Sequence, residues 1–559
     1  MKNNMARLGV LAMVGLGMAS LTAKQVKHTP ADWCTVIHPD RATMGEALAI
    51  TVRLHGVNEE LKLKVDLHWR DAEGTYRGFY TAGQEVLRAA NDTNLSFSYQ
   101  LRPKAGGTVA AVEPVIVLSP TGEWADRTKH ATGPPIPVSA GKSAEQPPGS
   151  LTGVPPPKDL HPRAPKTPWE VNPYREWENG PSKSAEYFPI AVWLQDPALA
   201  KTYKEAGINL FVGLWKGPTE KHLDQLKAAG MPVICHQNKV GLTSEDNDII
   251  VGWLQMDEPD NAKSVDGVWK NDLDAMNSAW PGVSRQEWGQ WGPPMPPSRI
   301  QSRYDEIKKK DPTRPVHLNL GVGVAWDKAV GRGIRSGHLE DYPEYIEGCD
   351  QVSFDIYPAA SSRPAVRERL WMVARGVHRL GKWSKPGQPV WNCLEASKIS
   401  YPQADITPHK IRAEFWMAII FGSRGVIYFV HQFKPAFNAD SLLDNPDLLA
   451  GVTEINRQVH ALAPVINSPT VVGGATVDSA NEQVPVALMT KRVEDATYVF
   501  SVAMNYGHTV GRFTVEGIGD ATAEVLGEDR QVAVKDGAFQ DAFGGYDVHL
   551  YRIVKATKR

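Results

Sequence analysis

Between Phe188 and Phe433 the chain alternates short apolar runs with segments of helical periodicity, and this alternation limits the possible folds more than any other feature. The apolar runs are, in order, FPIAVWL, INLFVGLW, MPVICHQN, IVGWLQM, RPVHLNL, DQVSFDIYP, QPVWNCLEAS and RGVIYFVHQF. Helical candidates lie between most of them, at 298–310, 365–381 and 408–422, and a last helix is expected at about 442–463. Strands that alternate with helices form βα units on a parallel sheet.

Eight such units in about 250 residues match the size of a closed (β/α)8 barrel. The competing fold is a doubly wound open sheet. Its phosphate-binding turn, G-x-G-x-x-G after the first strand, is not present in the sequence. We therefore expect an α/β TIM barrel.

The regions on either side of the barrel have a different pattern. Residues 35–139 and 468–559 contain short segments that alternate apolar and polar residues, which is typical of antiparallel β domains. The stretch Pro134–Pro168 is rich in Pro, Gly and Ser and predicts an extended linker or a chain that lies on a neighbouring surface. The expected domains are an N-terminal β-sandwich at 33–139, a Pro-rich linker at 140–185, the catalytic barrel at 186–466 and a C-terminal β-sandwich at 467–559.

Charge and composition exclude some classes of partner. The formal net charge is -2 over 559 residues, and no long basic run occurs, so nucleic acid is not an expected partner. The chain has 17 Trp residues, and flat apolar rings of this kind stack on sugars, although most aromatic side chains in a soluble protein are buried.

Residues 1–23 have the features of a secretory signal peptide. A positive start with Lys2 and Arg7 precedes a short apolar run, and Ala19 and Ala23 are small residues suitable for cleavage. The apolar run is short for a membrane span, although an uncleaved N-terminal anchor is an alternative. We expect a secreted or periplasmic protein that has no membrane partner after cleavage.

The four cysteines are Cys34, Cys235, Cys349 and Cys393, and no two of them form a C-x-x-C pair. A zinc framework is therefore not expected. Cys235 and Cys393 fall in apolar strands and are expected to be buried thiols, although an exported protein could pair some of its cysteines.

Two carboxylates are placed at the ends of predicted barrel strands. The fourth strand ends in GWLQMDEPDN, with Asp257 and Glu258 before Pro259, and the seventh ends in NCLEAS with Glu395. The carboxyl ends of barrel strands form the active-site face, so both glutamates are expected to open onto one mouth. A protonated carboxyl beside an ionised one is the pair that cleaves a glycosidic bond.

At these residues the chain resembles the retaining β-glycoside hydrolases of clan A, which are TIM-barrel glycosidases. In that clan the acid/base Glu ends strand four, usually as Asn-Glu-Pro, and the nucleophile Glu ends strand seven. The resemblance covers about 188–465 and implies that Glu258 is the acid/base and Glu395 the nucleophile. Here Asp257 replaces the usual Asn, and an ionised Asp would raise the pKa of Glu258.

Other polar and aromatic residues lie near predicted strand ends. Tyr357 is expected to donate a hydrogen bond to Glu395, as a tyrosine near there contacts the nucleophile in the resembled clan. Asp355 lies two residues earlier and faces the same side. The further candidates for binding sugar are Asp257, His236, Gln237, Asn319, His431, Trp193 and Trp215. A metal site from His236, His317 and His431 has no supporting spacing, so no metal or cofactor is expected.

The segment after the fourth strand brings Trp269, Trp280, Trp288 and Trp291 towards the active-site rim. Loops at this face carry specificity, so Trp288 and Trp291 are candidates for stacking on pyranose rings. The alternative is that these rings pack on each other as a small core.

These patterns predict a retaining glycoside hydrolase that acts on β-linked oligo- or polysaccharides, with its carboxyl groups about 5–5.5 Å apart. Endo action on a polysaccharide and exo action like that of a β-galactosidase or β-glucosidase both remain open. A non-catalytic carbohydrate-binding protein and a metal-dependent barrel enzyme are the alternatives from other classes.

Overall fold

The computed structural model describes residues 25–43, 47–70, 75–80, 86–92, 94–101, 110–121, 127–139, 153–162, 172–265, 267–270, 273–278, 280 and 291–555. The chain forms two compact units, Met1–Ser150 and Leu151–Arg559. The predicted signal peptide, 1–23, lies outside the described residues. Among the described helices, none has both the length and the apolar character needed to cross a bilayer.

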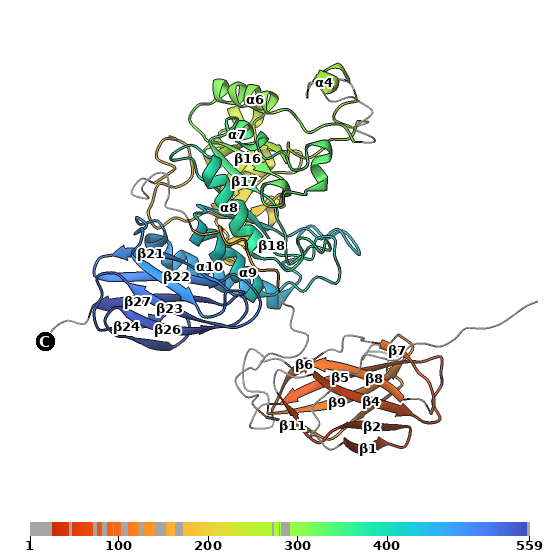
Figure 1. Ribbon diagram of the computed structural model, residues 1–559. Helices are drawn as coiled ribbons and strands as arrows, with labels where there is room; N and C mark the ends of the chain where they lie inside the picture. The colour runs from red at the N-terminus through yellow and green to blue at the C-terminus, as the bar shows by residue number, and fades with distance from the viewer. Residues whose placement is uncertain are drawn as a thin grey trace, which may run out of the picture. The chain divides into compact units, whose positions relative to one another are not determined.

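The N-terminal unit is a sandwich of two sheets (Figure 1). One sheet has the order β1-β2-β4-β8 (Gln25–Ala31, Cys34–Pro39, Ala47–Leu54, Asn94–Gln100). The other contains β3 (Ala42–Thr43), β11 (Ile136–Ser139), β9 (Ala111–Ser119), β5 (Lys62–Arg70) and β6 (Tyr76–Tyr80), with β10 (Lys129–Thr132) and β7 (Val86–Arg88) paired at its side. Side chains alternate between buried and partly exposed along β5, and the buried ones pack against residues of the first sheet such as Val36 and Ile50. The predicted sandwich is confirmed.

The second unit contains eight parallel strands, as the apolar runs predict. They are β12 (Ile190–Trp193), β13 (Leu210–Val212), β14 (Val233–His236), β15 (Ile250–Asp257), β16 (Val316–Leu320), β17 (Gln351–Phe354), β18 (Asn392–Glu395) and β19 (Val426–Phe429). Consecutive strands pair from β12 to β17, β18 pairs with β19, and β19 pairs with β12. Between β17 and β18 the backbone N–H of Trp391 donates to Val352 O at 2.8 Å, which closes the ring. The barrel is therefore confirmed, and the open-sheet alternative is wrong.

Helices surround this barrel. They are α1 (Ala200–Glu205), α2 (Glu220–Ala229), α3 (Lys239–Thr243), α4 (Leu273–Ser278), α6 (Pro297–Lys310), α7 (Asp341–Ile346), α8 (Trp371–Trp383), α9 (Pro408–Phe421) and α10 (Pro446–Ile466), with short 3-10 turns at Pro197–Leu199, Asn247–Ile249, Val322–Val324 and Val330–Arg335. The helix predicted from residue 365 begins later because Glu368 adopts a positive φ of 62°, which a helix does not allow. Asn445 caps α10 by accepting a hydrogen bond from the N–H of Leu448.

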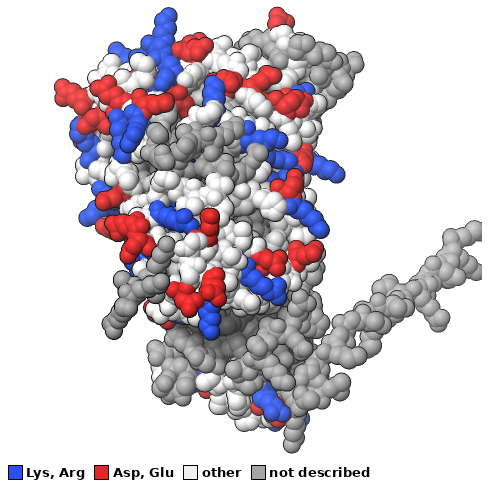
Figure 2. Space-filling model, turned by 60° about the vertical axis from the view of Figure 1, so that its left-hand side comes forward, with Lys and Arg blue, Asp and Glu red and all other residues white. Residues whose placement is uncertain are grey.

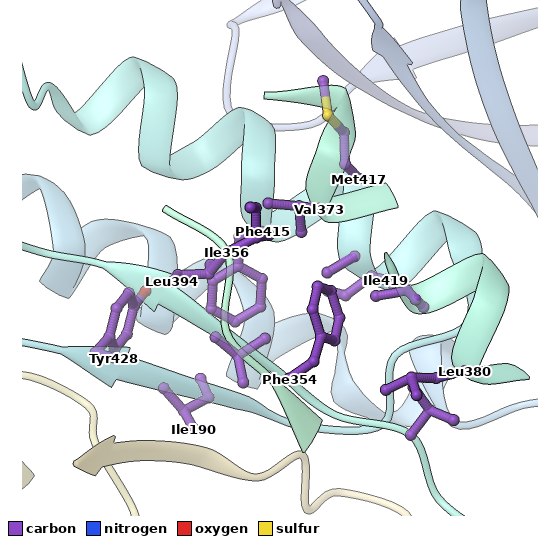
Figure 3. Packing of buried hydrophobic residues seen from close by; sticks show 14 of the residues in the cluster. Ile190, Phe354, Ile356, Val373, Leu380, Leu394, Phe415, Met417, Ile419 and Tyr428 are labelled. Atoms are coloured by element: carbon purple, nitrogen blue, oxygen red, sulfur yellow. The ribbon is translucent and has the colours of Figure 1, made fainter. Parts of the chain in front are cut away.

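Apolar side chains fill the layer between the strands and the helices. Figure 3 shows Phe354 and Leu394 on the strand side of this layer and Phe415 of α9 close by. Nearly every residue of α9 is buried, because one face covers the barrel and another packs on the C-terminal domain. Burial on all sides explains why the second half of α9, from Phe415 to Phe421, has apolar side chains around its whole circumference.

A separate cluster fills the inside of the barrel, and residues before the first strand complete it from below. Tyr174 lies in this cluster, where its Oη accepts a hydrogen bond from Trp391 Nε1 at 3.0 Å and donates one to Arg424 O at 3.0 Å. The preceding segment 153–162 lies on the same unit, since Trp371 Nε1 donates to Val154 O at 2.7 Å. These parts of the Pro-rich region are thus bound to the barrel.

The C-terminal domain has two antiparallel sheets. One has the order β20-β23-β26 (Ala475–Ser479, Thr509–Val515, Ala538–Phe543) and the other β21-β22-β27-β24-β25 (Val486–Val493, Ala496–Ala503, Val548–Lys555, Ala521–Val525, Arg530–Val534). The ring of Trp416 in α9 lies 5.0 Å from that of Phe500 in β22, so the barrel and this domain share a packed interface. Figure 2 shows acidic and basic side chains interspersed over one face of the molecule, as expected from the net charge of -2.

Candidate active site

Three carboxyl groups gather at the carboxyl ends of neighbouring barrel strands. Asp257 is the last residue of β15, Glu258 follows it, and Asp355 follows β17. Asn319 of β16 lies between them, and its Nδ2 donates to Asp257 Oδ1 and to Asp355 Oδ1, both at 2.9 Å. Asp257 is exposed, whereas Glu258 and Asp355 are half-buried. We call Asp257, Glu258 and Asp355 the acidic cluster.

The register of the strands creates this arrangement. Asp257 and Asn319 are Cα partners across β15 and β16, and Asn319 and Ser353 are partners across β16 and β17. The pairing of β15 with β16 shifts between Leu254 and Asp257, and such an irregularity re-aims the side chains that follow it. The carboxylate at the end of β15 therefore faces the inward side chains of the next two strands.

The backbone of Glu258 adopts a left-handed conformation, with φ at +42°. Its N–H donates to Asn319 O at 2.9 Å, and its carbonyl accepts a hydrogen bond from Lys263 Nζ at 2.6 Å. A side chain other than glycine is strained in this region, and surrounding contacts must hold it there. Strain of this kind at a strand end is frequent at functional sites.

The pKa values of the three carboxyl groups in the acidic cluster are all raised above their ordinary values. Burial, followed by the charges of Asp355 and Asp257, raises the pKa of Glu258 well above its ordinary value. Burial and the charge of Asp257 raise the pKa of Asp355 to about 7, against the opposing effect of the Asn319 hydrogen bond. The pKa of Asp257 is also raised, because the surrounding strand ends desolvate its carboxyl group although the residue as a whole is exposed. The three groups titrate together, so protonated and ionised carboxyls coexist near neutral pH.

Glu395 differs from the expectation that it opens onto the mouth beside Glu258. Its side chain has 0% exposure, and its Oε1 accepts hydrogen bonds from the N–H groups of Ala359 at 2.6 Å and Ala360 at 3.1 Å. The loop that follows β17 therefore covers this carboxyl. Glu414 of α9 is close enough for the two carboxyl groups to interact, and burial raises the pKa of Glu395 to about 7.

The predicted hydrogen bond from Tyr357 to Glu395 is wrong. Tyr357 Oη has no hydrogen-bond partner among the described residues, and neither has Glu395 Oε2. The ring of Tyr357 packs at 5.3 Å from that of Phe429, inside the barrel.

Three other predicted sugar binders use their polar atoms within the protein. Asn319 is 1% exposed; its Nδ2 is shared between the two aspartates, and its Oδ1 accepts from Ser353 Oγ at 2.6 Å. Gln237 Nε2 donates to Ile307 O of α6 at 3.1 Å, so this amide faces the helical layer. His431 is 6% exposed and its Nε2 accepts from Gln195 Nε2 at 3.2 Å. In the free protein these three side chains are thus engaged within the fold, and their binding to sugar hydroxyls stays a prediction; His236 at the end of β14 is half-buried.

The predicted tryptophans divide into buried and exposed rings. Trp193 is 8% exposed and belongs to the barrel interior, which leaves little surface for stacking. Trp215, after β13, is 70% exposed, and Trp291 is 56% exposed. Trp288 lies outside the described residues. Trp269 is fully buried, and Trp280 donates to Pro294 O at 3.1 Å. Both rings pack against the main core of the barrel unit and do not form a separate small core of their own.

Sequence reasoning missed two groups of residues. Phe433 and Phe437, 48% and 66% exposed, follow β19 and lie 5.8 Å apart. They belong to the sequence HQFKPAF, which follows the last barrel strand, and this position at the active-site end of the barrel could have identified them. Ser353, and the contact of His317 with it, were the second: both are inward-facing polar residues on β17 and β16, and strand alternation from Asp355 and Asn319 would have identified this pair, whereas the sequence suggested His317 only as a metal ligand. Among the described residues no group of three His, Cys, Asp or Glu side chains is arranged to hold a metal.

Comparisons with known proteins give fold similarity only. No family model and no curated protein sequence matches the chain. Solved structures that it is similar to include an alpha-amylase from Geobacillus thermoleovorans, at 11% identity over 67% of this chain and 100% of that chain, with a TM-score of 0.42. A GH30 endoxylanase from Clostridium papyrosolvens C71 is 10% identical over 66% of this chain and 96% of that chain, with a TM-score of 0.33. These similarities are too distant to say anything about the site.

Proposed function

We propose that the chain is a glycoside hydrolase that cleaves β-linked glycans at the carboxyl-terminal end of the barrel, with Glu258 as the proton donor. The observation that carries the proposal is the acidic cluster itself: a half-buried, strained glutamate of raised pKa beside two aspartates that share one amide donor. A glycosidic oxygen leaves as a poor anion unless it is protonated, and a carboxyl that keeps its proton near neutral pH supplies that proton.

The second carboxylate of the reaction is proposed to be Glu395, as the resemblance to clan A implies. Two backbone N–H groups stabilise the charged form of this carboxyl, and its Oε2 makes no hydrogen bond within the described residues. Attack on an anomeric carbon requires that the loop at Ala359 and Ala360 moves when substrate binds, since Glu395 is fully buried in the free protein.

A second arrangement is supported by the accessibility of Asp355. This carboxyl is half-buried, belongs to the same cluster as Glu258 and has a pKa of about 7. In this arrangement Asp355, when ionised, acts on the sugar or on a water molecule, and Glu395 has a structural role. Both arrangements use Glu258 in the same way.

Exposed rings around the barrel mouth support a carbohydrate substrate. Trp215 follows β13, and Phe433 and Phe437 follow β19, so these surfaces lie at the same end of the barrel as the cluster. Flat apolar rings stack on the faces of pyranose sugars. Export to the periplasm or the medium is part of the proposal and depends on the signal-like residues 1–23.

The experiment is a hydrolysis screen over α- and β-linked aryl glycosides and over plant, algal and microbial polysaccharides, with products sized by chromatography. A 2-deoxy-2-fluoro glycoside of the best sugar then traps any covalent intermediate, and peptide mapping identifies the labelled residue. Label on Glu395 supports the retaining arrangement, and label on Asp355 supports the second one. Binding of glycans without release of reducing ends would instead support a non-catalytic carbohydrate-binding protein, for which the complete burial of Glu395 is the favouring observation.

A further inference from the structure

A chain of buried polar side chains runs from inside the barrel to the acidic cluster. Gln351 Nε2 lies 2.8 Å from His317 Nδ1, and His317 Nε2 lies 2.9 Å from Ser353 Oγ. Ser353 Oγ is 2.6 Å from Asn319 Oδ1, and Asn319 Nδ2 contacts Asp257 and Asp355. Gln351, His317 and Ser353 are fully buried. The strand register aligns them, because Gln351 and His317 are Cα partners, as are Ser353 and Asn319.

The direction of each hydrogen bond in this chain follows from the donors available. An amide nitrogen only donates, so His317 Nδ1 accepts from Gln351 and His317 carries its proton on Nε2. That N–H donates to Ser353 Oγ, which leaves the serine hydroxyl to donate to Asn319 Oδ1. Burial lowers the pKa of His317 to about 3, which agrees with a neutral ring.

We propose that Ser353 and His317 are positioning residues of the active site: they fix the orientation of the Asn319 amide, so that its two N–H groups hold Asp257 and Asp355 as a pair of acceptors beside Glu258. An Asn side chain rotated by 180° would present its oxygen to two carboxylates, which is repulsive unless they are protonated. The hydroxyl of Ser353 opposes that orientation because it donates to Oδ1 at 2.6 Å, and it is the stronger of two donors there, since the thiol of Cys393 contacts the same oxygen at 3.7 Å. The inference deepens the proposed function and rests on it for its catalytic meaning.

This orientation of Asn319 favours the ionised form of the two aspartates and the protonated form of Glu258. Donation by Asn319 opposes the rise in pKa of both aspartates, and their charges in turn raise the pKa of Glu258. The other titratable groups that act on these carboxyls are Asp260 and Lys263 after β15, Tyr357 after β17, and Cys393 of β18. Lys263 and Asp260 act on Glu258 with opposite signs, and Tyr357 and Cys393 are neutral at ordinary pH because burial raises the pKa of each.

The test uses Ser353→Ala, which removes the hydroxyl, and Ser353→Thr, which keeps it and is the matched control. The pKa of Asp355 is measured on the full-length protein by NMR titration of 13C-labelled aspartate, with its resonance assigned from Asp355→Asn. In Ser353→Ala we expect this pKa to rise by about one unit, because the Asn319 donor is no longer held in place. In Ser353→Thr we expect the wild-type value. An unchanged titration in a folded Ser353→Ala would overturn the proposal.

A second variant and a second readout keep the test decisive. His317→Phe keeps a ring against Trp391, which lies 5.4 Å away, but removes both nitrogen atoms, so it is used if Ser353→Ala does not fold. For the active enzyme, the pH profile of kcat/KM should become narrower in Ser353→Ala, with the acidic limb shifted up and the basic limb shifted down. A purely structural role for Ser353 would lower activity at all pH values and leave both limbs in place. The NMR titration of Asp355 does not depend on turnover. A wild-type protein that hydrolyses no glycoside would therefore refute the proposed function, whereas the titration alone would still show whether Ser353 positions Asn319.

Discussion

Glu395, at the end of β18, and Glu414, in the middle of α9, are two fully buried carboxyl groups that lie close enough to interact. Burial raises the pKa of Glu395 to about 7 and that of Glu414 well above its ordinary value. The charge of Glu395 raises the pKa of Glu414 further. Two charges so close in a dry interior are costly, and the pair therefore keeps at least one proton at neutral pH.

This pair makes stability depend on pH. In the unfolded chain a glutamate has a pKa of about 4.3. Because the folded-state pKa values are higher, the folded chain binds more protons between about pH 4 and 7. The stability that these two carboxyl groups contribute by binding protons in the folded state is complete below the pKa of the unfolded chain, and it is lost as the pH rises through about 7. In Glu414→Gln, the melting temperature should fall less steeply between pH 5 and 8 and should exceed that of wild type at pH 8. Glu245→Gln, at an exposed position, is the control, and equal slopes in all three proteins would contradict the prediction.

Glu258→Gln should lower kcat about 10²- to 10⁴-fold on glycosides with poor leaving groups, because glutamine has no proton to donate. Activated aryl glycosides, whose leaving groups need little protonation, should be affected much less. Steady-state kinetics on one natural oligosaccharide and on its nitrophenyl counterpart compare the two. A similar loss on both substrates would show that Glu258 does not act as the proton donor.

Trp215→Ala should raise KM for oligosaccharides several-fold and leave kcat nearly unchanged. Its indole is 70% exposed at the end of β13, and loss of a stacking surface removes binding that is equal in the ground state and the transition state. Trp215→Phe, which keeps a ring, should retain most of the affinity. A fall in kcat at constant KM would place Trp215 in the chemistry instead.

Arg332, in the 3-10 turn after β16, is a buried cation whose loss should destabilise the loops after β15 and β16 that it joins. Its Nη2 donates to Asp341 at 2.7 Å and its Nε donates to Asp260 O at 3.2 Å, with 1% of its side chain exposed. Removing one partner of such a network costs about 3–5 kcal/mol. Arg332→Met should therefore lower the urea midpoint sharply. Arg457→Met, which removes an exposed cation paired with Glu454, should leave it unchanged.

The four cysteines are all free and buried, at Cys34, Cys235, Cys349 and Cys393. Burial raises the pKa of Cys34 to about 11, so its reactive thiolate is scarce at neutral pH. We expect no reaction of the native protein with Ellman's reagent and four thiols after unfolding. Fewer than four thiols in denaturant without reductant would show that a disulfide forms.

Strand positions were predictable because the signal is local. Eight apolar runs, each followed by a polar or turn segment, identify the barrel, and two-residue alternation places Asp355 on the inner face. The same rule places Gln237 on the outer face, one residue after the inward His236, and applying it would have removed Gln237 from the sugar binders.

The burial of Glu395 was not predictable, because it depends on a loop 35 residues away in sequence. The N–H groups of Ala359 and Ala360 cover the carboxyl, and no pattern in NCLEAS records that contact. The irregular pairing between Leu254 and Asp257 could not be predicted from the sequence either, because it arises from the contact with β16. Long-range packing of this kind likewise decides which tryptophans of a loop become core and which remain exposed.

Tyr174 lies in the interior cluster of the barrel although it precedes the first strand, and its hydroxyl joins Trp391 of the barrel interior to the backbone at Arg424. A shortened protein that starts at the first barrel strand would thus lack Tyr174, which closes the amino-terminal end of the barrel interior. Water would then reach Trp391 at that end, and a catalytic fragment that contains the barrel strands and helices alone should be unstable and should aggregate on expression.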